Sequence, residues 1–262
     1  MGSANAVQAS LDFALIARET VARASLTDRL IATRMCATSP LYCDYNPGAL
    51  VEYHAFTDQS DPALHGPAMR TGHSDHTTMV LLGLAKAYGL MGRAAKANHW
   101  RARTLAAVRA SGRLYDRCHT LAFAGCFHAL LLHQWSEAQA AIDEMSGLLA
   151  NEALPNWTGY LNLCQGLLRV QRGEAEAGLV RARRGVRALI SARVFGIWWY
   201  IIYADACIQT GAFAEAEALL AKAGAIFDTG EWRFASELTR LTAHLQRARG
   251  TLSQHLQHLR RP

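Results

Sequence analysis

The feature that most constrains the fold of this chain is a sequence pattern typical of a helix end, which recurs at nearly equal spacing along the chain. Gly92, Gln134, Gly173 and Gly211 each follow an apolar run and precede a new amphipathic segment, and the steps between them are 42, 39 and 38 residues. Glycine readily adopts the left-handed backbone that ends a helix. A period near 40 residues indicates a repeat architecture in which each two-helix unit buries its apolar face against its neighbours.

The pattern is firmest from residue 75 to residue 262, which we interpret as one region of helical repeats. Helices of this length joined by short turns must pair antiparallel. We therefore predict an all-α fold, a TPR-like α-solenoid in which antiparallel helix pairs form a right-handed superhelix. The predicted helices cover about 76–91, 93–111, 115–133, 135–150, 156–172, 174–191, 194–210, 212–228, 231–249 and 251–260.

Residues 1–74 form a second region with a different pattern. Two helices are predicted within 7–38, and the sequence Ser25-Leu26-Thr27-Asp28 is typical of the cap at the start of the second. Residues 39–75 contain four of the six prolines, which predicts a long irregular connection with a short helix around Ala49–Phe56. Long loops inside compact repeats are often functional.

The composition suits a helical protein with a large core, since 51% of the residues are hydrophobic. No apolar run reaches the roughly 18 uncharged residues of a membrane span, so we expect no membrane partner. The N-terminus has neither the basic start nor the apolar core of a secretion signal. The six cysteines are scattered without a Cys-x-x-Cys motif, which favours a reducing, cytoplasmic location.

The net charge of +6 comes mostly from arginine. Within the densest block of arginines, the only acidic residues in the sequence are Glu174 and Glu176. Two interpretations stay open, a solvated helix face and a surface for an anionic partner. Direct nucleic-acid binding is not favoured, because the sequence shows no docking element to accompany the charge. The block consists of Arg169, Arg172, Arg181, Arg183, Arg184, Arg187 and Arg193.

Histidines gather in the proline-rich connection and suggest an alternative, an enzyme or metal protein. His54, His65, His73 and His76 lie there, and the last two are three residues apart. Zinc needs three or four ligands with a recognisable spacing, and this cluster has no such signature. The chain also lacks the phosphate-loop, Gly-x-Ser-x-Gly and His-Glu-x-x-His motifs. We therefore expect no catalytic residues, no metal and no cofactor.

The aromatic segment Trp198–Tyr203 first suggests a binding platform. However, Trp199, Ile202, Tyr203 and Ala206 follow the spacing of one apolar stripe, which predicts core.

The neighbouring face should line a concave groove. In successive repeats it carries Thr78, Leu81, Ala85 and Tyr88, then Thr120, Phe123 and Phe127, then Gly159, Asn162, Gly166 and Arg169, then Ile197, Tyr200, Ala204 and Cys207. From its polar and amphipathic members we select candidate ligand- or partner-binding residues, Thr78, Tyr88, Thr120, Asn162, Arg169 and Tyr200.

Several segments resemble a known family. The segments are Asp28–Met35, Pro62–His65, Gly72–His76 leading into Leu84–Arg93, Gly173–Leu179, Gly211–Ala218 and Glu231–Leu241. Together they look like the C-terminal helical-repeat region of large bacterial transcriptional regulators that also carry a STAND-type ATPase and a winged-helix or LuxR-type DNA-binding domain. Some relatives carry an adenylate cyclase instead.

The resemblance implies a non-catalytic interaction or ligand-sensing module of a regulatory system. The partner would be a protein or a small-molecule effector in the concave groove. The ATPase and DNA-binding domains of such regulators are absent from this chain, so any signal would pass to another domain or chain.

Overall fold

The computed structural model describes residues 12, 15–16, 18–21, 23–43, 47–70, 75–192, 196–227 and 234–259, without the side chains of 38–43, 62–63, 227 and 251–259. Every regular element within these ranges is a helix, which confirms the all-α prediction. The elements are α2 (Leu26–Cys43), α3 (Pro47–Gln59), α4 (Pro62–Met69), α5 (His76–Leu90), α6 (Ala94–Ser111), α7 (Leu114–Thr120), the π-helix η1 (Leu121–Phe127), α8 (His128–Leu131), α9 (Trp135–Leu149), α10 (Pro155–Gln171), α11 (Ala175–Ser191), α12 (Ile197–Gln209), α13 (Phe213–Phe227) and α14 (Ala235–Leu259).

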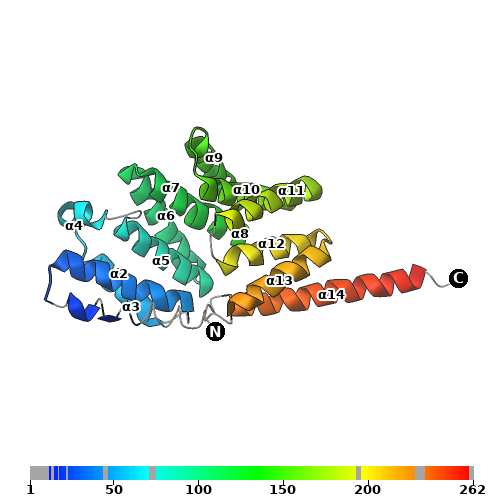
Figure 1. Ribbon diagram of the computed structural model, residues 1–262, viewed down its shortest axis with the longest axis horizontal. Helices are drawn as coiled ribbons and strands as arrows, with labels where there is room; N and C mark the ends of the chain where they lie inside the picture. The colour runs from blue at the N-terminus through cyan, green and yellow to red at the C-terminus, as the bar shows by residue number, and fades with distance from the viewer. Residues whose placement is uncertain are drawn as a thin grey trace.

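The helices follow a curved path in chain order (Figure 1). Helices α2 to α4 lie at one end, α6, α7 and α9 to α11 form the far side of the curve, and α12 to α14 come back at the other end. Helices α5 and α12 therefore face each other across the inside of the curve, with α8 between them, and α14 extends away from the array.

The four predicted helix ends share one backbone geometry. At each of these helix ends a backbone N–H donates a hydrogen bond to the carbonyl five residues earlier. The four bonds, all of 2.8–3.0 Å, are Arg93 to Tyr88, Gln134 to Ala129, Glu174 to Arg169 and Ala212 to Cys207. This is the long bond of a Schellman turn. The left-handed residue is Gly92, Gly173 or Gly211 in three turns, and in the fourth it is His133, with φ of 56°.

Small residues bring α10 and α11 into close contact. A Cβ added at Gly166 would lie 2.4 Å from the backbone nitrogen of Ala182, and one added at Gly185 would lie 2.5 Å from that of Leu163. The two backbones therefore touch where side chains normally separate helices. The space that Gly159 and Gly166 leave on the predicted groove face is filled by α11 and is not open to a ligand.

The buried apolar residues form two clusters. The smaller one joins α2 and α3 to α5 and α6 through residues such as Tyr53, Phe56 and Trp100. The larger one extends from α6 to α14 and includes Trp199, 1% exposed, and Tyr203, 1% exposed. The stripe predicted as core on α12 is thus buried as expected.

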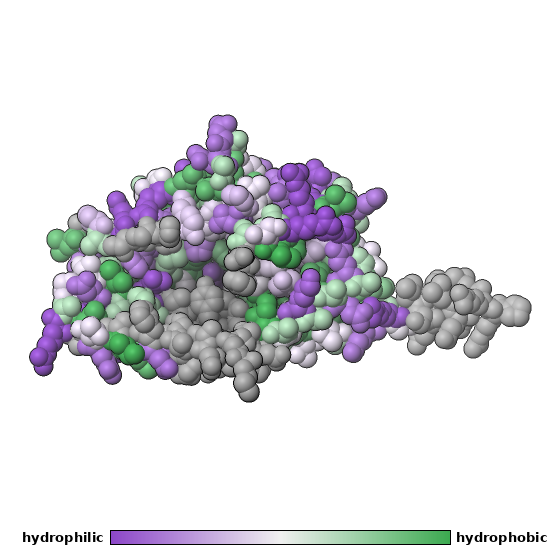
Figure 2. Space-filling view, viewed as in Figure 1, coloured by the Kyte–Doolittle hydropathy of each residue, from purple (hydrophilic) through white to green (hydrophobic). Residues whose placement is uncertain are grey.

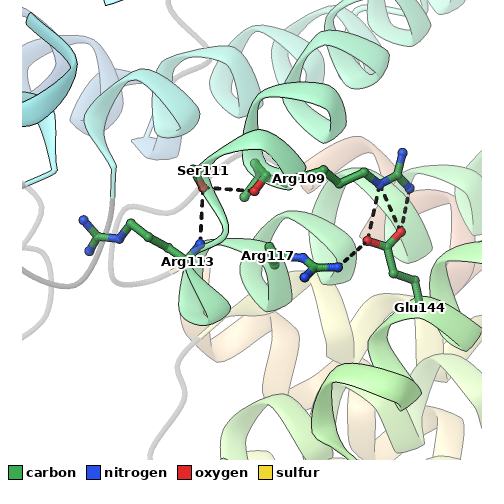
Figure 3. Close-up of polar contacts among 6 residues, drawn as sticks. Arg109, Ser111, Arg113, Arg117 and Glu144 are labelled. Atoms are coloured by element: carbon green, nitrogen blue, oxygen red, sulfur yellow. Dashed lines mark hydrogen bonds and ion pairs between the residues drawn. The ribbon is translucent and has the colours of Figure 1, made fainter.

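A carboxylate between two arginines connects three helices on the outer side of the array (Figure 3). Glu144 of α9 accepts hydrogen bonds from Nη2 of Arg109 on α6 at 2.6 Å and from Nη2 of Arg117 on α7 at 3.1 Å. The hydrogen bond from Arg109, with a smaller contribution from Arg117, lowers the pKa of Glu144. The paired charges hold α9 against the preceding pair of helices.

The structure differs from the sequence expectations in three places. The connection over 39–75, predicted to be irregular apart from a short helix around Ala49–Phe56, contains two helices, α3 at the predicted place and α4 in addition. Pro47 and Pro62 stand at the first position of these helices, where proline is tolerated. The helices predicted at 231–249 and 251–260 are one helix, α14. The helix predicted at 115–133 contains the π-helix η1, which the α-helical periodicity does not reveal. The first predicted helix, near Val7, falls mostly outside the described residues.

Other expectations are met. Oγ of Ser25 accepts a hydrogen bond from the backbone N–H of Asp28, which is the predicted cap of α2. Among the helices that the structure describes, none combines the length and apolar character needed to cross a membrane.

Candidate functional site

A largely apolar pocket of about 330 Å³ lies on the inside of the curve, between α5, the η1–α8 segment and the start of α12. Its side chains come from parts of the chain more than 100 residues apart in sequence. In the space-filling view the surface is hollowed near the middle of the face shown (Figure 2). The lining residues are Leu82, Ala85, Lys86, Gly89, Leu90, Phe123, Ala124, Phe127, His128, Leu131, Leu132, Gly196, Trp198 and Phe234.

The π-helix supplies the central wall of this pocket. Phe123, Ala124 and Phe127 belong to it, and α8 continues directly with His128 and Leu131. π-Helical turns are rare and often occur at functional sites. The Nε of Arg101, on α6, donates a hydrogen bond of 2.7 Å to the carbonyl of Ala124, and Arg101 also pairs with Glu137. The widened turn is therefore held by side-chain hydrogen bonding.

Aromatic rings form a continuous layer behind the pocket. The Trp198 ring centroid lies 4.4 Å from that of Phe127, 5.1 Å from that of Phe123 and 5.2 Å from that of Tyr160, on which it stacks. Phe127 also contacts Phe234 at 6.3 Å. Such ring pairs add specific contacts to the burial of apolar area.

Among the described residues that line the pocket, Lys86 is the one lysine or arginine, and none is an aspartate or glutamate. Its Nζ lies 4.0 Å from the centroid of the Phe123 ring, which is a cation–π contact. Burial and, to a smaller extent, the positive charge of Arg101 lower the pKa of His128 to about 4. His128 is therefore neutral at pH 7, which leaves Lys86 as the charged side chain among the described residues of the lining.

A second histidine, His119, lies behind the pocket wall. Its ring contacts Phe123 at 4.8 Å and Trp157 at 5.5 Å. Burial lowers its pKa to about 3, with a contribution from the charge of Lys86. The electrostatic influence of Lys86 thus extends through the aromatic wall.

The predicted groove residues on the first two repeats are buried and do not line the pocket. Thr78 is 2% exposed and Thr120 is fully buried, and Oγ1 of Thr120 has no hydrogen-bond partner among the described atoms. The hydroxyl of Tyr88 lies 2.8 Å from Nε2 of His54. Their helices pack these side chains against neighbouring helices.

The other three predicted residues lie apart from one another. Asn162 donates a hydrogen bond of 2.9 Å to the carbonyl of Thr158 on its own helix. Tyr200 is half-buried and stacks on Trp199 with a centroid distance of 3.7 Å. Arg169 lines a different, smaller pocket with Arg172 and Arg181. The structure does not bring the six residues together into one site.

The histidines of the proline-rich region are dispersed. Nε2 of His54 is hydrogen-bonded to the hydroxyl of Tyr88, and His65 accepts a hydrogen bond from the backbone N–H of Asp61. Nδ1 of His76 accepts a hydrogen bond of 3.1 Å from Arg34. His73 lies outside the described residues. No group of three or more potential metal ligands occurs in the part of the chain that the structure describes.

The arginine block is divided between two environments. Arg183 makes a bidentate ion pair with Glu215 of α13, and the hydroxyl of Tyr203 donates to the same carboxylate. Arg169, Arg172 and Arg181 face the smaller pocket instead. Arg193 lies outside the described residues.

The sequence placed Ala85, Phe123 and Phe127 on the correct face but did not mark them as site residues. The six candidate binding residues were chosen from polar and amphipathic side chains, whereas most side chains that line the pocket are apolar. Lys86, which is adjacent to Ala85, could have indicated the site. It is the one lysine or arginine in α5, and this helix has no aspartate or glutamate.

Comparisons of the chain with protein-family models, with curated proteins and with solved structures find no match.

Proposed function

We propose that this chain is a ligand-sensing helical-repeat module that binds a small amphiphilic anion in the pocket between α5, η1–α8 and α12. The observation that carries the proposal is a largely apolar pocket of about 330 Å³ in which Lys86 is the charged side chain at pH 7 among the described lining residues. Ligand pockets are typically apolar cavities with a few placed polar groups.

The size of the pocket limits the ligand. An apolar cavity of about 150 Å³ holds a benzene molecule, so a volume of about 330 Å³ accommodates roughly a dozen non-hydrogen atoms by the same measure. A medium-chain carboxylic acid such as decanoate has this size.

The charge of the pocket indicates the end group of the ligand. A carboxylate near Lys86 would form a charge-assisted hydrogen bond, while the chain would lie against the Phe127 and Trp198 rings. Because no acidic side chain is among the described residues of the lining, a positively charged ligand would find no carboxylate among them and would lose its hydration.

The repeat-like turns and the resemblance to regulator C-terminal regions support a regulatory role for such binding. Helices α5 and α12 belong to different helix pairs, so a ligand between them would favour one curvature of the array. A TPR-like superhelix would transmit this preference to a partner protein or to the ATPase of a regulator. We propose this sensing role rather than a catalytic one.

Isothermal titration calorimetry with decanoate tests the proposal. We expect saturable binding that is lost in Ala85→Leu, because the larger side chain occupies the pocket. The matched control is Ala106→Leu, which adds the same atoms at an exposed position of α6. Failure of wild-type protein to bind decanoate or any other medium-chain acid, or equal loss in both variants, would overturn the proposal.

A further inference from the structure

A second pocket, polar where the first is apolar, lies between α9, α10 and α11. Its volume is about 190 Å³. Three of the residues that line it are arginines. The lining comprises Gln139, Ile142, Asp143, Gln165, Leu168, Arg169, Arg172 and Arg181.

The positive charges of this pocket are poorly compensated within the described structure. Arg181 forms no ion pair with any residue that the structure describes, and its Nε is buried without a hydrogen-bond partner among the described atoms. Arg169 has only a distant contact of 3.7 Å with Glu174. Asp143, the one acidic residue of the lining, accepts a hydrogen bond of 2.6 Å from the amide of Gln139.

The arginines also repel one another. Burial lowers the pKa of Arg181, and the charges of Arg169 and Arg184 lower it further. The negative end of the α10 dipole accounts for cations at Arg169 and Arg172, which lie at the end of that helix. It does not account for Arg181, which lies in the middle of α11. A bound anion would remove the repulsion and satisfy the buried Nε.

We propose that this pocket binds the phosphate group of a small phosphate monoester. Guanidinium groups match phosphate oxygens in pairs. A phosphate monoester carries nearly two negative charges and three acceptor oxygens at pH 7, so it can engage three arginines, whereas a carboxylate carries one charge and two oxygens. The pocket volume corresponds to roughly six water molecules, which suits a phosphate head group.

The surroundings favour a small molecule over a nucleic acid. A nucleic-acid surface needs charges that follow the backbone over several phosphates. Here Arg183, on the same helix as Arg181, is already paired with Glu215. Arg169, Arg172 and Arg181 thus share one pocket, whereas Arg184 and Arg187 are exposed on α11 outside its lining.

Calorimetric titration at constant ionic strength tests this inference, with inorganic phosphate and glycerol 3-phosphate as probes. We expect saturable binding of both that weakens at least about tenfold in Arg181→Gln and in Arg172→Gln, since each removes a charge-assisted hydrogen bond. The control is Arg93→Gln, which removes one charge from an exposed position in the α5–α6 turn and should leave binding unchanged. Circular dichroism spectra should show that all three variants remain folded.

Further arms distinguish the sources of the phosphate. Vesicles of phosphatidylcholine with and without phosphatidic acid test a lipid head group, and a single-stranded RNA tests a nucleic-acid backbone. Binding of glycerol 3-phosphate and dependence on Arg181 support the proposal whether or not the vesicles also bind. Absence of phosphate binding, an equal effect of Arg93→Gln, or binding of RNA without binding of glycerol 3-phosphate would overturn it. None of these results depends on decanoate binding in the apolar pocket.

Discussion

The Nζ of Lys86 lies 4.0 Å from the centroid of the Phe123 ring, and both side chains line the same apolar pocket. The contact connects α5 with the π-helix and positions one positive charge beside an apolar wall. In the proposed function, Lys86 binds the anionic end group of the ligand, and Phe123 with its neighbouring rings contacts the apolar chain.

Replacing Lys86 separates these two roles. We expect Lys86→Gln to weaken decanoate binding roughly tenfold, because a charge-assisted hydrogen bond is lost, while binding of decanol stays within about twofold. Lys96→Gln is the control, since Lys96 lies 5.2 Å from the Tyr88 ring centroid and outside the pocket. Titration calorimetry measures both ligands. Equal weakening of acid and alcohol would contradict the assigned role of Lys86.

Adding a methyl group at Gly166 should destabilise the fold. Its Cβ would meet the backbone of Ala182 at 2.4 Å, so α10 and α11 must separate. We expect Gly166→Ala to lower the free energy of unfolding by at least about 2 kcal/mol. Gly147→Ala, where no atom lies within 4 Å, should be neutral or stabilising by about 0.5–1 kcal/mol. Urea denaturation measures both. Similar values for the two variants would show that the close contact is not a structural requirement.

The Glu144 carboxylate should stabilise the fold in a pH-dependent way. Its pKa is lower in the folded protein than in the unfolded chain because Arg109 and Arg117 bind the ionised form. The stabilisation is therefore complete above the unfolded pKa of about 4.3 and is lost as the pH falls through the folded pKa. We expect Glu144→Gln to lower the free energy of unfolding by about 1–2 kcal/mol at pH 7. The effect is no larger because Arg109 is half exposed, and solvent weakens its ion pair with Glu144.

Denaturation at pH 7 and at pH 3 measures this effect. The difference between wild type and Glu144→Gln should shrink at the lower pH. Glu176→Gln, which removes an exposed carboxylate from α11, serves as control. A difference that is constant with pH would mean that the variant perturbs packing rather than charge.

Buried histidines predict a second pH effect, at milder acidity. The pKa of His119 is lowered to about 3 and that of His128 to about 4, chiefly by burial. The unfolded chain takes up these protons near pH 6.5, so the folded state loses stability as the pH falls from about 6.5 towards 4. We expect His119→Phe, which keeps a ring in the aromatic layer, to reduce this loss.

Thermal unfolding between pH 7 and pH 4.5 measures the histidine effect. The exposed His99 provides the control, and His99→Phe should keep the wild-type pH dependence. A wild-type melting temperature that does not fall over this range would be evidence against neutral, buried imidazoles beside the pocket.

The sequence predicts much of the fold because helix ends depend on local chemistry. Glycine at 92, 173 and 211 requires only the backbone freedom that the turn uses. His133 performs the same role without glycine, so the fourth turn was predicted from the apolar run that precedes Gln134 and from the spacing of the repeats. The short helix predicted around Ala49–Phe56 is present and extends over 47–59. The helix at 62–69 was not predicted, because proline breaks a helix interior but is accepted at a first turn.

The candidate site was less accessible to sequence analysis, because it depends on how helices cross. Thr120 and Phe123 were assigned to one face, yet the first is buried and the second lines the pocket. The π-helix that follows Thr120 changes the rotation of the side chains after it, and no feature of the sequence indicates this. The approach of α11 to Gly166 likewise fills the space beside the small residues of the predicted groove face.

Methyl NMR of the protein with decanoate tests the central proposal most directly, because it locates the ligand as well as detecting it. We predict that the methyl resonances of Leu82 and Leu131, which line the pocket, shift in a saturable way. Those of Leu163 and Leu241, which are fully buried elsewhere in the core, should stay in place. Shifts confined to residues outside the pocket, or no shifts at saturating decanoate, would contradict the account.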